Sequence, residues 1–102
     1  MRLKGKSVFI TGATGAIGSA TAKRFLSEGA NVVLVGRSED KLRTLSESLN
    51  HSKTITTCVA EALDEVAVKQ SLECCIDTFG SLDVVFANAG TEGVKYVVYR
   101  VL

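Results

Sequence analysis

Apolar residues in this chain occur in four short runs that alternate with longer stretches of mixed polarity. The runs are Ser7–Thr11, Asn31–Gly36, Thr54–Ala60 and Asp83–Ala87. They are bounded by turn residues and rich in β-branched side chains, which favours strands. In Asn31–Gly36 the apolarity is continuous rather than alternating, as is typical of a parallel strand buried on both faces. The pattern therefore predicts four strands of a parallel sheet.

The stretches between these runs have the spacing of helices. The first helix is expected from about Ala16 to Glu28, with Gly29 as its stop. Ser38 and Asp64 are expected to cap the second and third helices, and Gly80 to end the third. The residues expected to share one apolar face are Ile17, Thr21 and Phe25, then Leu42, Leu45 and Leu49, then Val68, Leu72, Cys75, Ile76 and Phe79.

Alternation of strands and helices predicts an α/β fold, with right-handed crossovers and helices on both faces of a parallel sheet. The expected strand order is 3-2-1-4, which reverses between the first and fourth strands. Ligands bind at such a reversal, beyond the carboxyl ends of the strands. Two glycine-bearing turns fall there, one from Thr11 to Gly18 and one at Asn88-Ala89-Gly90. The sequence therefore predicts a ligand site at this edge.

Composition narrows the class of protein. The chain has 102 residues and a net charge of +1, so it is one domain or part of one, with no electrostatic support for nucleic-acid binding. No apolar stretch approaches the length of a membrane helix, about 20 residues. The three cysteines, Cys58, Cys74 and Cys75, contain no C-x-x-C pair. We interpret them as reduced thiols of a cytoplasmic protein rather than as a disulfide or metal site.

The two turns together resemble the short-chain dehydrogenase/reductase family, from about Arg2 to Gly93. The compact branch of that family carries T-G-x-x-x-G-x-G after the first strand and N-N-A-G after the fourth. This chain has Ala16 at the usual middle glycine and Ala87 at the first asparagine. The glycine spacing also fits the extended branch, but the Phe79–Asp83 and Gly36–Ser38 segments resemble the compact one. The resemblance implies a Rossmann-like fold that is incomplete relative to the family.

The resemblance also implies which residues contact a dinucleotide. The backbone from Gly12 to Gly18 would hold the pyrophosphate, with Ile17 donating its N–H, and Asn88 to Gly90 would lie near the riboses. Glu61 stands where the family often has an aspartate that binds the adenine amino group. The expected cofactor-binding residues are Gly12, Thr14, Gly15, Ala16, Ile17, Gly18, Arg37, Ser38, Glu61, Asn88, Ala89 and Gly90.

The end of the second strand favours NADP over NAD. NAD sites place an acid there to accept hydrogen bonds from the ribose hydroxyls, whereas this chain has Gly36 followed by Arg37. A guanidinium pairs with a 2′-phosphate through charge-assisted bonds. Ser38, Lys41 and Thr14 are placed to assist it.

The family's catalytic serine, tyrosine and lysine lie downstream of the fourth strand, and no residue here matches them. Tyr96 precedes Arg100 by four residues, but it stands too near the fourth strand, and arginine is a poor substitute for lysine. We therefore expect no catalytic residue, and an isolated chain that is inactive as a truncated part of an NADP-dependent oxidoreductase.

The expected organisation is a dinucleotide-binding segment over residues 1–93 and an atypical tail over residues 94–102. The tail is β-prone and is either an extra strand or a foreign end from a frameshift, altered splicing or a misread gene boundary. An exposed fourth strand invites pairing with another chain. A non-catalytic interaction module, or a homo-oligomer formed through this edge or the tail, is therefore the alternative hypothesis.

Overall fold

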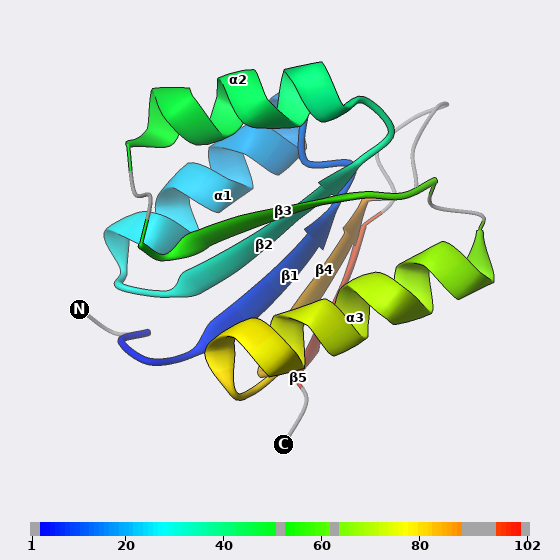
Figure 1. The fold of residues 1–102 in the computed structure, drawn as a ribbon. Coiled ribbons are helices and arrows are strands. Elements are labelled where there is room, and N and C mark those ends of the chain that lie inside the picture. Colours follow the sequence, from blue (N-terminus) through cyan, green and yellow to red (C-terminus); the bar gives the residue numbers. More distant parts are fainter. Residues whose placement is uncertain (1–2, 51–52, 62–63, 89–95, 101–102) are drawn as a thin grey trace.

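The computed structural model describes residues 3–50, 53–61, 64–88 and 96–100 (Figure 1). Helices and strands alternate as far as the fourth strand, and a fifth strand follows. The elements are β1 (Ser7–Thr11), α1 (Ala16–Ser27), β2 (Asn31–Gly36), α2 (Glu39–Leu49), β3 (Ile55–Val59), α3 (Glu65–Phe79), β4 (Val84–Asn88) and β5 (Tyr96–Arg100). The four predicted strands and three predicted helices are confirmed, with their limits shifted by at most one residue.

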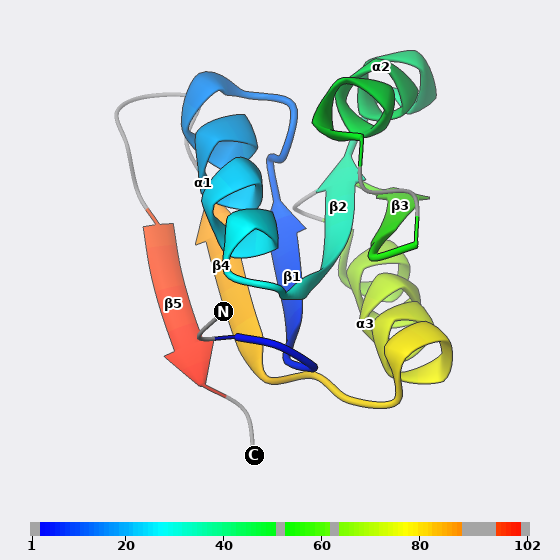
Figure 2. The ribbon, with the colours of Figure 1, turned by 90° about the vertical axis from the view of Figure 1, so that its left-hand side faces the viewer.

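The strands form one sheet in the order β3-β2-β1-β4-β5. The first four strands in this order are parallel, and β5 runs antiparallel to β4, with Val85 opposite Tyr99. Figure 2 shows β5 beside β4, with its arrowhead at the opposite end. The predicted order 3-2-1-4 is confirmed, and the reversal lies between β1 and β4. Because β5 pairs with β4, the described part of the tail forms an extra strand, which is one of the two expected alternatives for it, and β4 is an inner strand of the sheet.

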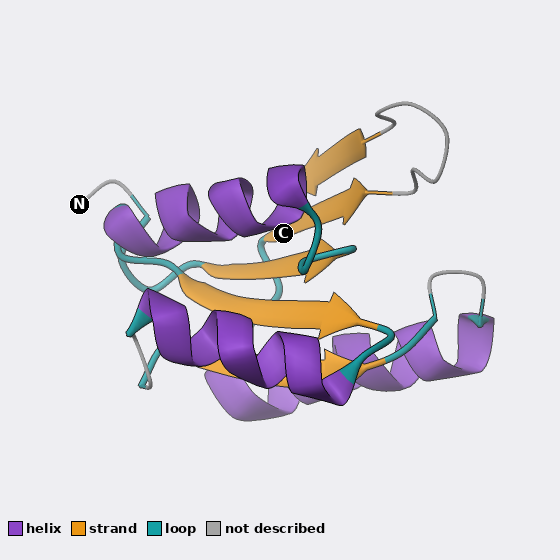
Figure 3. Cartoon of the chain, turned by 90° about the horizontal axis from the view of Figure 1, so that it is seen from above, coloured by secondary structure: helices purple, strands orange, loops and turns teal. Residues whose placement is uncertain are grey.

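Helices α1 and α2 cover one face of the sheet and α3 covers the other (Figure 3). Alternate residues of β1 and β2 therefore enter two separate cores. Val8, Ile10 and Leu34 pack with α1 and α2, whereas Phe9 and Val33 pack with Cys75 of α3. Every residue of β1 is buried, and so is β2 from Val32 onward. The continuous apolar runs thus correspond to strands covered on both faces.

Local chemistry fixes the ends of the helices. The Ser38 hydroxyl accepts the backbone N–H of Lys41 at 3.3 Å, and the Asp64 carboxylate accepts that of Ala67 at 3.1 Å. Gly29 and Gly80, which follow α1 and α3, have φ values of +87° and +81°, in the left-handed region that favours glycine. The predicted caps and stops are therefore confirmed.

Two helix faces differ from the prediction. In α3, Ile76 is 48% exposed, because its neighbour Cys75 occupies the buried line together with Ser71. Two adjacent helical residues lie about 100° apart, so both cannot point into one narrow core. In α1 the buried line is Gly18, Ala22 and Leu26 rather than the larger side chains one position earlier. Small residues allow this helix to approach the sheet closely.

None of the three helices, over the residues described, is both long and apolar enough to cross a membrane.

Candidate functional site

The turn between β1 and α1 needs two of its three glycines for its own geometry. Gly12 has a φ of +62°, which L side chains rarely adopt. A Cβ on Gly18 would lie 2.3 Å from the carbonyl oxygen of Gly12, so no side chain fits there. Gly15 differs, because its φ is −74° and a Cβ would make an ordinary 3.5 Å contact with the same oxygen. The fold therefore does not explain why residue 15 is glycine.

Of the three helices, α1 is the one whose N-terminus has no side-chain cap. Gly15 precedes it without a side-chain cap, and its first turn holds no acid. In contrast, α2 and α3 have Ser38 and Asp64 as caps, and both have acids in the first turn. The first backbone N–H groups of a helix have no partner within the helix and lie at the positive end of its dipole. The N–H of Gly15 donates to the carbonyl of Gly12 at 3.2 Å, so the segment from Ala16 to Gly18 presents the donors that would stabilise an anion.

Backbone contacts join this turn to the end of β2. The N–H of Ala13 donates to the carbonyl of Val35 at 3.1 Å. A Cβ on Gly36 would lie 3.6 Å from the Thr14 methyl carbon and 3.3 Å from a methyl carbon of Leu42. Thr14 and Gly36 are therefore neighbours, and a side chain at residue 36 would have to displace Leu42 by a few tenths of an ångström.

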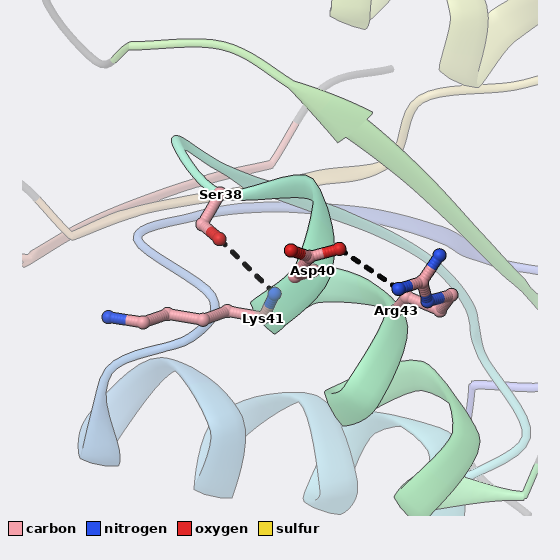
Figure 4. A network of polar contacts seen from close by, with 4 residues as sticks. All are labelled: Ser38, Asp40, Lys41 and Arg43. Atoms are coloured by element: carbon pink, nitrogen blue, oxygen red, sulfur yellow. Dashed lines mark hydrogen bonds and ion pairs between the residues drawn. The ribbon is translucent and has the colours of Figure 1, made fainter.

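Two cations follow Gly36 at the start of α2. Arg37 and Lys41 are both exposed, and in the part of the chain that the structure describes neither of them forms an ion pair. The nearby acid Asp40 is instead paired with Arg43, with 2.9 Å between Nη2 and Oδ1. Figure 4 shows the Lys41 side chain extending away from this pair. Both cations at the end of β2 are therefore available to a ligand without breaking an ion pair among the described residues.

A hollow of about 420 Å³ lies between the glycine turn and α2. Its wall combines hydroxyl groups with one cation and one acid. The lining residues are Thr14, Ser19, Asp40, Lys41, Thr44, Leu45 and Ser48. Sequence reasoning missed Ser19 and Thr44, because only the packing of α1 beside α2 brings these two hydroxyls to one wall. No spacing within either helix could have indicated it.

The remaining predicted residues lie toward the same edge as far as the structure describes them. Glu61 is exposed and follows Ala60, whose N–H donates to the carbonyl of Gly36 at 2.9 Å. Asn88 is the last residue of β4, two positions beyond Phe86, which pairs with Ile10 of β1. Ala89 and Gly90 lie outside the described residues. Ser38 has a structural role as the cap of α2, as the sequence also predicted.

This arrangement matches known proteins. A family model described as short chain dehydrogenase matches residues 6–98. The chain is 40% identical over 88 residues to an uncharacterized oxidoreductase of Staphylococcus haemolyticus, covering 86% of this chain and 38% of that protein. It is 43% identical over 93 residues to a glucose 1-dehydrogenase of Gluconobacter oxydans, covering 89% and 35%.

Solved structures give the same result. The apo-form of glucose dehydrogenase from Caenorhabditis elegans superposes with a TM-score of 0.83 at 29% identity, covering 90% of this chain and 40% of that one. A 3-ketoacyl-(acyl-carrier-protein) reductase from Brucella melitensis complexed with NADH superposes with a TM-score of 0.74 at 30% identity, covering 81% and 34%. The chain thus spans between about a third and two-fifths of the length of the proteins it resembles.

Proposed function

Because this chain belongs to the short-chain dehydrogenase/reductase family, we propose that it is the NADP(H)-binding part of an oxidoreductase. The family transfers hydride between a nicotinamide and an alcohol or carbonyl, and the bound cofactor supplies that hydride chemistry. The role proposed for these residues is to hold and orient the dinucleotide. No catalytic residue is assigned within the chain, and the substrate is left open.

The observation that carries the proposal is the unexplained glycine at the uncapped end of α1. The turn requires Gly12 and Gly18 for its own backbone, but it does not require Gly15. Absence of a side chain at residue 15 leaves the N–H groups of Ala16, Ile17 and Gly18 open to a ligand. A pyrophosphate has the charge and the acceptor oxygens that such a helix end favours.

The preference for NADP follows from the charges beyond β2. Arg37 and Lys41 would pair with a 2′-phosphate, and Thr14, whose methyl group faces Gly36, would donate to it from its hydroxyl. Residue 36 is glycine. It therefore offers no carboxylate to accept a hydrogen bond from the 2′-hydroxyl of NAD. The Brucella relative is complexed with NADH, so the choice between the two cofactors is a proposal about this chain's own residues.

Calorimetry on the purified chain tests both parts. NADPH is expected to bind more tightly than NADH, and Arg37→Ala to weaken NADPH binding about tenfold or more, since a hydrogen bond to a charged group contributes about 1.5–3 kcal/mol. The same Arg37→Ala substitution should change the affinity for NADH little. Lys69→Ala removes an exposed cation from α3 on the other face of the sheet and serves as the matched control. Equal loss of both cofactors in Arg37→Ala would contradict the NADP assignment, and no binding of either would contradict the function.

The alternative function, association with another chain, now concerns β5 rather than β4. Strand β5 is the terminal strand of the sheet on this side, and a terminal strand offers backbone groups for pairing. Light scattering after size-exclusion chromatography would detect this association as a dimer whose fraction increases with protein concentration. The dimer should be lost when residues 94–102 are removed. A monomer at all concentrations would contradict it.

A further inference from the structure

Strand β3 forms the edge of the sheet that lies opposite β5 (Figure 2). Among the described strands it pairs with β2, in parallel and in continuous register from Ile55 to Val59. Helices α2 and α3 pack on its two faces, with Ile55 in the core on the α2 side and Cys58 against the core on the α3 side. Thr57 is nevertheless exposed, and Val59 is 54% exposed. The two helices therefore leave this edge open to solvent.

The backbone of β3 alternates between groups that bond to β2 and groups that point away from the sheet. The carbonyl of Thr54 accepts the N–H of Val32 on β2 at 2.7 Å. In a strand, the N–H and C=O of one residue point to the same side, and those of the next residue point to the opposite side. The even-numbered residues of β3 therefore bond to β2. Ile55, Thr57 and Val59 direct their N–H and C=O groups outward, where no described strand lies.

The sequence of this edge lacks the features that usually prevent edge strands from pairing. Natural edges are protected by charged residues, by proline or by a bulge. Residues 54–60 contain no charge and no proline, and most of their side chains are β-branched. The first charges are Lys53 before this stretch and Glu61 after it. Both are exposed, and neither forms an ion pair among the described residues. The edge is thus an uncharged pairing surface with a cation at its start and an anion at its end.

We propose that β3 pairs antiparallel with β3 of a second copy of this chain, about a two-fold axis at Thr57. The two sheets then form one continuous sheet, and every contact away from the axis occurs twice. Ile55 lies opposite Val59 of the second copy, and Lys53 lies opposite its Glu61. The outward groups of Ile55, Thr57 and Val59 meet one another and form the hydrogen-bonded pairs of an antiparallel ladder.

Charge and side-chain type specify this register. Aliphatic pairs and pairs of opposite charge stabilise neighbouring antiparallel strands. With the axis one residue further along the chain, Ile55 would lie opposite Glu61. With the axis one residue earlier, Lys53 would lie opposite Val59. Either shift removes both ion pairs and places a charge against an aliphatic side chain. The strand is therefore complementary to a second copy of itself in the register centred on Thr57.

This pairing uses neither the glycine turn nor Arg37, so it does not depend on whether the proposed cofactor binding is correct. It also leaves β5 free at the other edge of the sheet. Glu61 is the residue expected near the adenine of the dinucleotide. The second copy would therefore contribute Lys53 beside that end of the proposed site.

Sedimentation equilibrium of the purified full chain, over a range of protein concentrations, tests the pairing. The wild type is expected to show a monomer–dimer equilibrium. Thr57→Lys places two ammonium groups opposite each other at the axis and should weaken the dimer about tenfold. Thr57→Val is the matched control, because it keeps a β-branched side chain of similar size and should keep the dimer. Residue 57 is exposed, so both variants should fold, which circular dichroism checks.

Exchange of charges tests the register. Lys53→Glu and Glu61→Lys should each weaken the dimer about tenfold, because two pairs of like charge replace two pairs of opposite charge. The double variant Lys53→Glu/Glu61→Lys restores the opposite charges and should restore the dissociation constant of the wild type. Lys69→Glu, on the exposed side of α3, is the control and should leave the dimer unchanged.

Three results would overturn the proposal. The first is a monomer at every concentration. The second is a dimer that Thr57→Lys and the single charge reversals leave equally strong, because such a dimer forms through another surface, such as β5. The third is a loss in the single reversals that the double variant does not restore, because Lys53 and Glu61 would then not face each other.

Discussion

The carboxylate of Asp83 accepts a hydrogen bond from the backbone N–H of Ser7, with 2.8 Å between nitrogen and Oδ2. This contact joins the start of β4 to the start of β1. The return contact runs from the N–H of Asp83 to the carbonyl of Ser7 at 2.9 Å. The Ser81 hydroxyl donates to the same carboxylate oxygen at 3.0 Å and lies 3.1 Å from the hydroxyl of Ser7. These bonds hold together the two strands whose opposite ends meet at the candidate site.

Asp83→Asn should therefore lower the free energy of unfolding, by about 1–3 kcal/mol, because a buried donor loses its charged acceptor. The variant keeps the size of the side chain, so the loss would report the hydrogen bonds rather than packing. Urea unfolding followed by circular dichroism measures it. Asp77→Asn, an exposed acid on α3, is the matched control. Equal stability of the two variants would contradict a role for the Ser7–Asp83 contact.

Two glycines of the turn should respond differently to the same substitution. Gly18→Ala places a methyl group 2.3 Å from the carbonyl oxygen of Gly12, so we expect a clear loss of stability in urea unfolding. Gly15→Ala adds only a 3.5 Å contact and should keep nearly the stability of the wild type. If a pyrophosphate binds against this residue, Gly15→Ala should nevertheless weaken NADPH binding in calorimetry at least tenfold.

The comparison of stability with binding distinguishes a structural glycine from a ligand-binding one. A Gly15→Ala variant that folds and binds NADPH as tightly as the wild type would remove the main support for the proposed function. If Gly15→Ala instead unfolded as readily as Gly18→Ala, residue 15 would be a structural glycine like Gly12.

The sequence predicted the fold well because each element is specified locally. Continuous apolar runs mark strands buried on both faces, and Ser38, Asp64 and Gly80 mark helix ends by their own hydrogen bonds or backbone conformation. It predicted the faces of α1 and α3 less well. Hydrophobicity alone favoured Ile76 over Ser71, yet the geometry of the helix buries Ser71 beside Cys75 and leaves Ile76 exposed.

The candidate site was predictable only where motifs run along the chain. The glycine turn and the Gly36-Arg37 pair are consecutive residues, so their order is visible in the sequence. In contrast, the hydroxyls of Ser19 and Thr44 share a hollow because α1 lies beside α2. The pairing of Asp40 with Arg43, which leaves Lys41 without an ion pair among the described residues, likewise depends on side-chain conformation.

Lys41 should contribute to binding of the 2′-phosphate but not of the rest of the dinucleotide. Lys41→Gln is expected to weaken NADPH binding several-fold and to leave NADH binding unchanged, with a smaller effect than Arg37→Ala because an ammonium makes no bidentate contact. The loss should shrink at high salt, since exposed charges are screened. Lys69→Gln is the control. An equal change for NADPH and NADH in calorimetry would place Lys41 outside the phosphate contact.

The thiol of Cys58 should make the stability of the reduced protein depend on pH above 9. Burial raises the pKa of Cys58 from 9.0 to about 11 in the folded chain. As the pH rises, the Cys58 thiol loses its proton in the unfolded chain before it does so in the folded chain. The contribution of Cys58 to the free energy of unfolding is therefore fully present below pH 9 and is lost as the pH rises toward 11. The free energy of unfolding, measured in urea with a reductant, should therefore fall more steeply over this range in the wild type than in Cys58→Ala. Because Cys75 titrates in both proteins, the difference isolates Cys58. Parallel curves from pH 9 to 11 would show that the Cys58 thiol is not buried against α3.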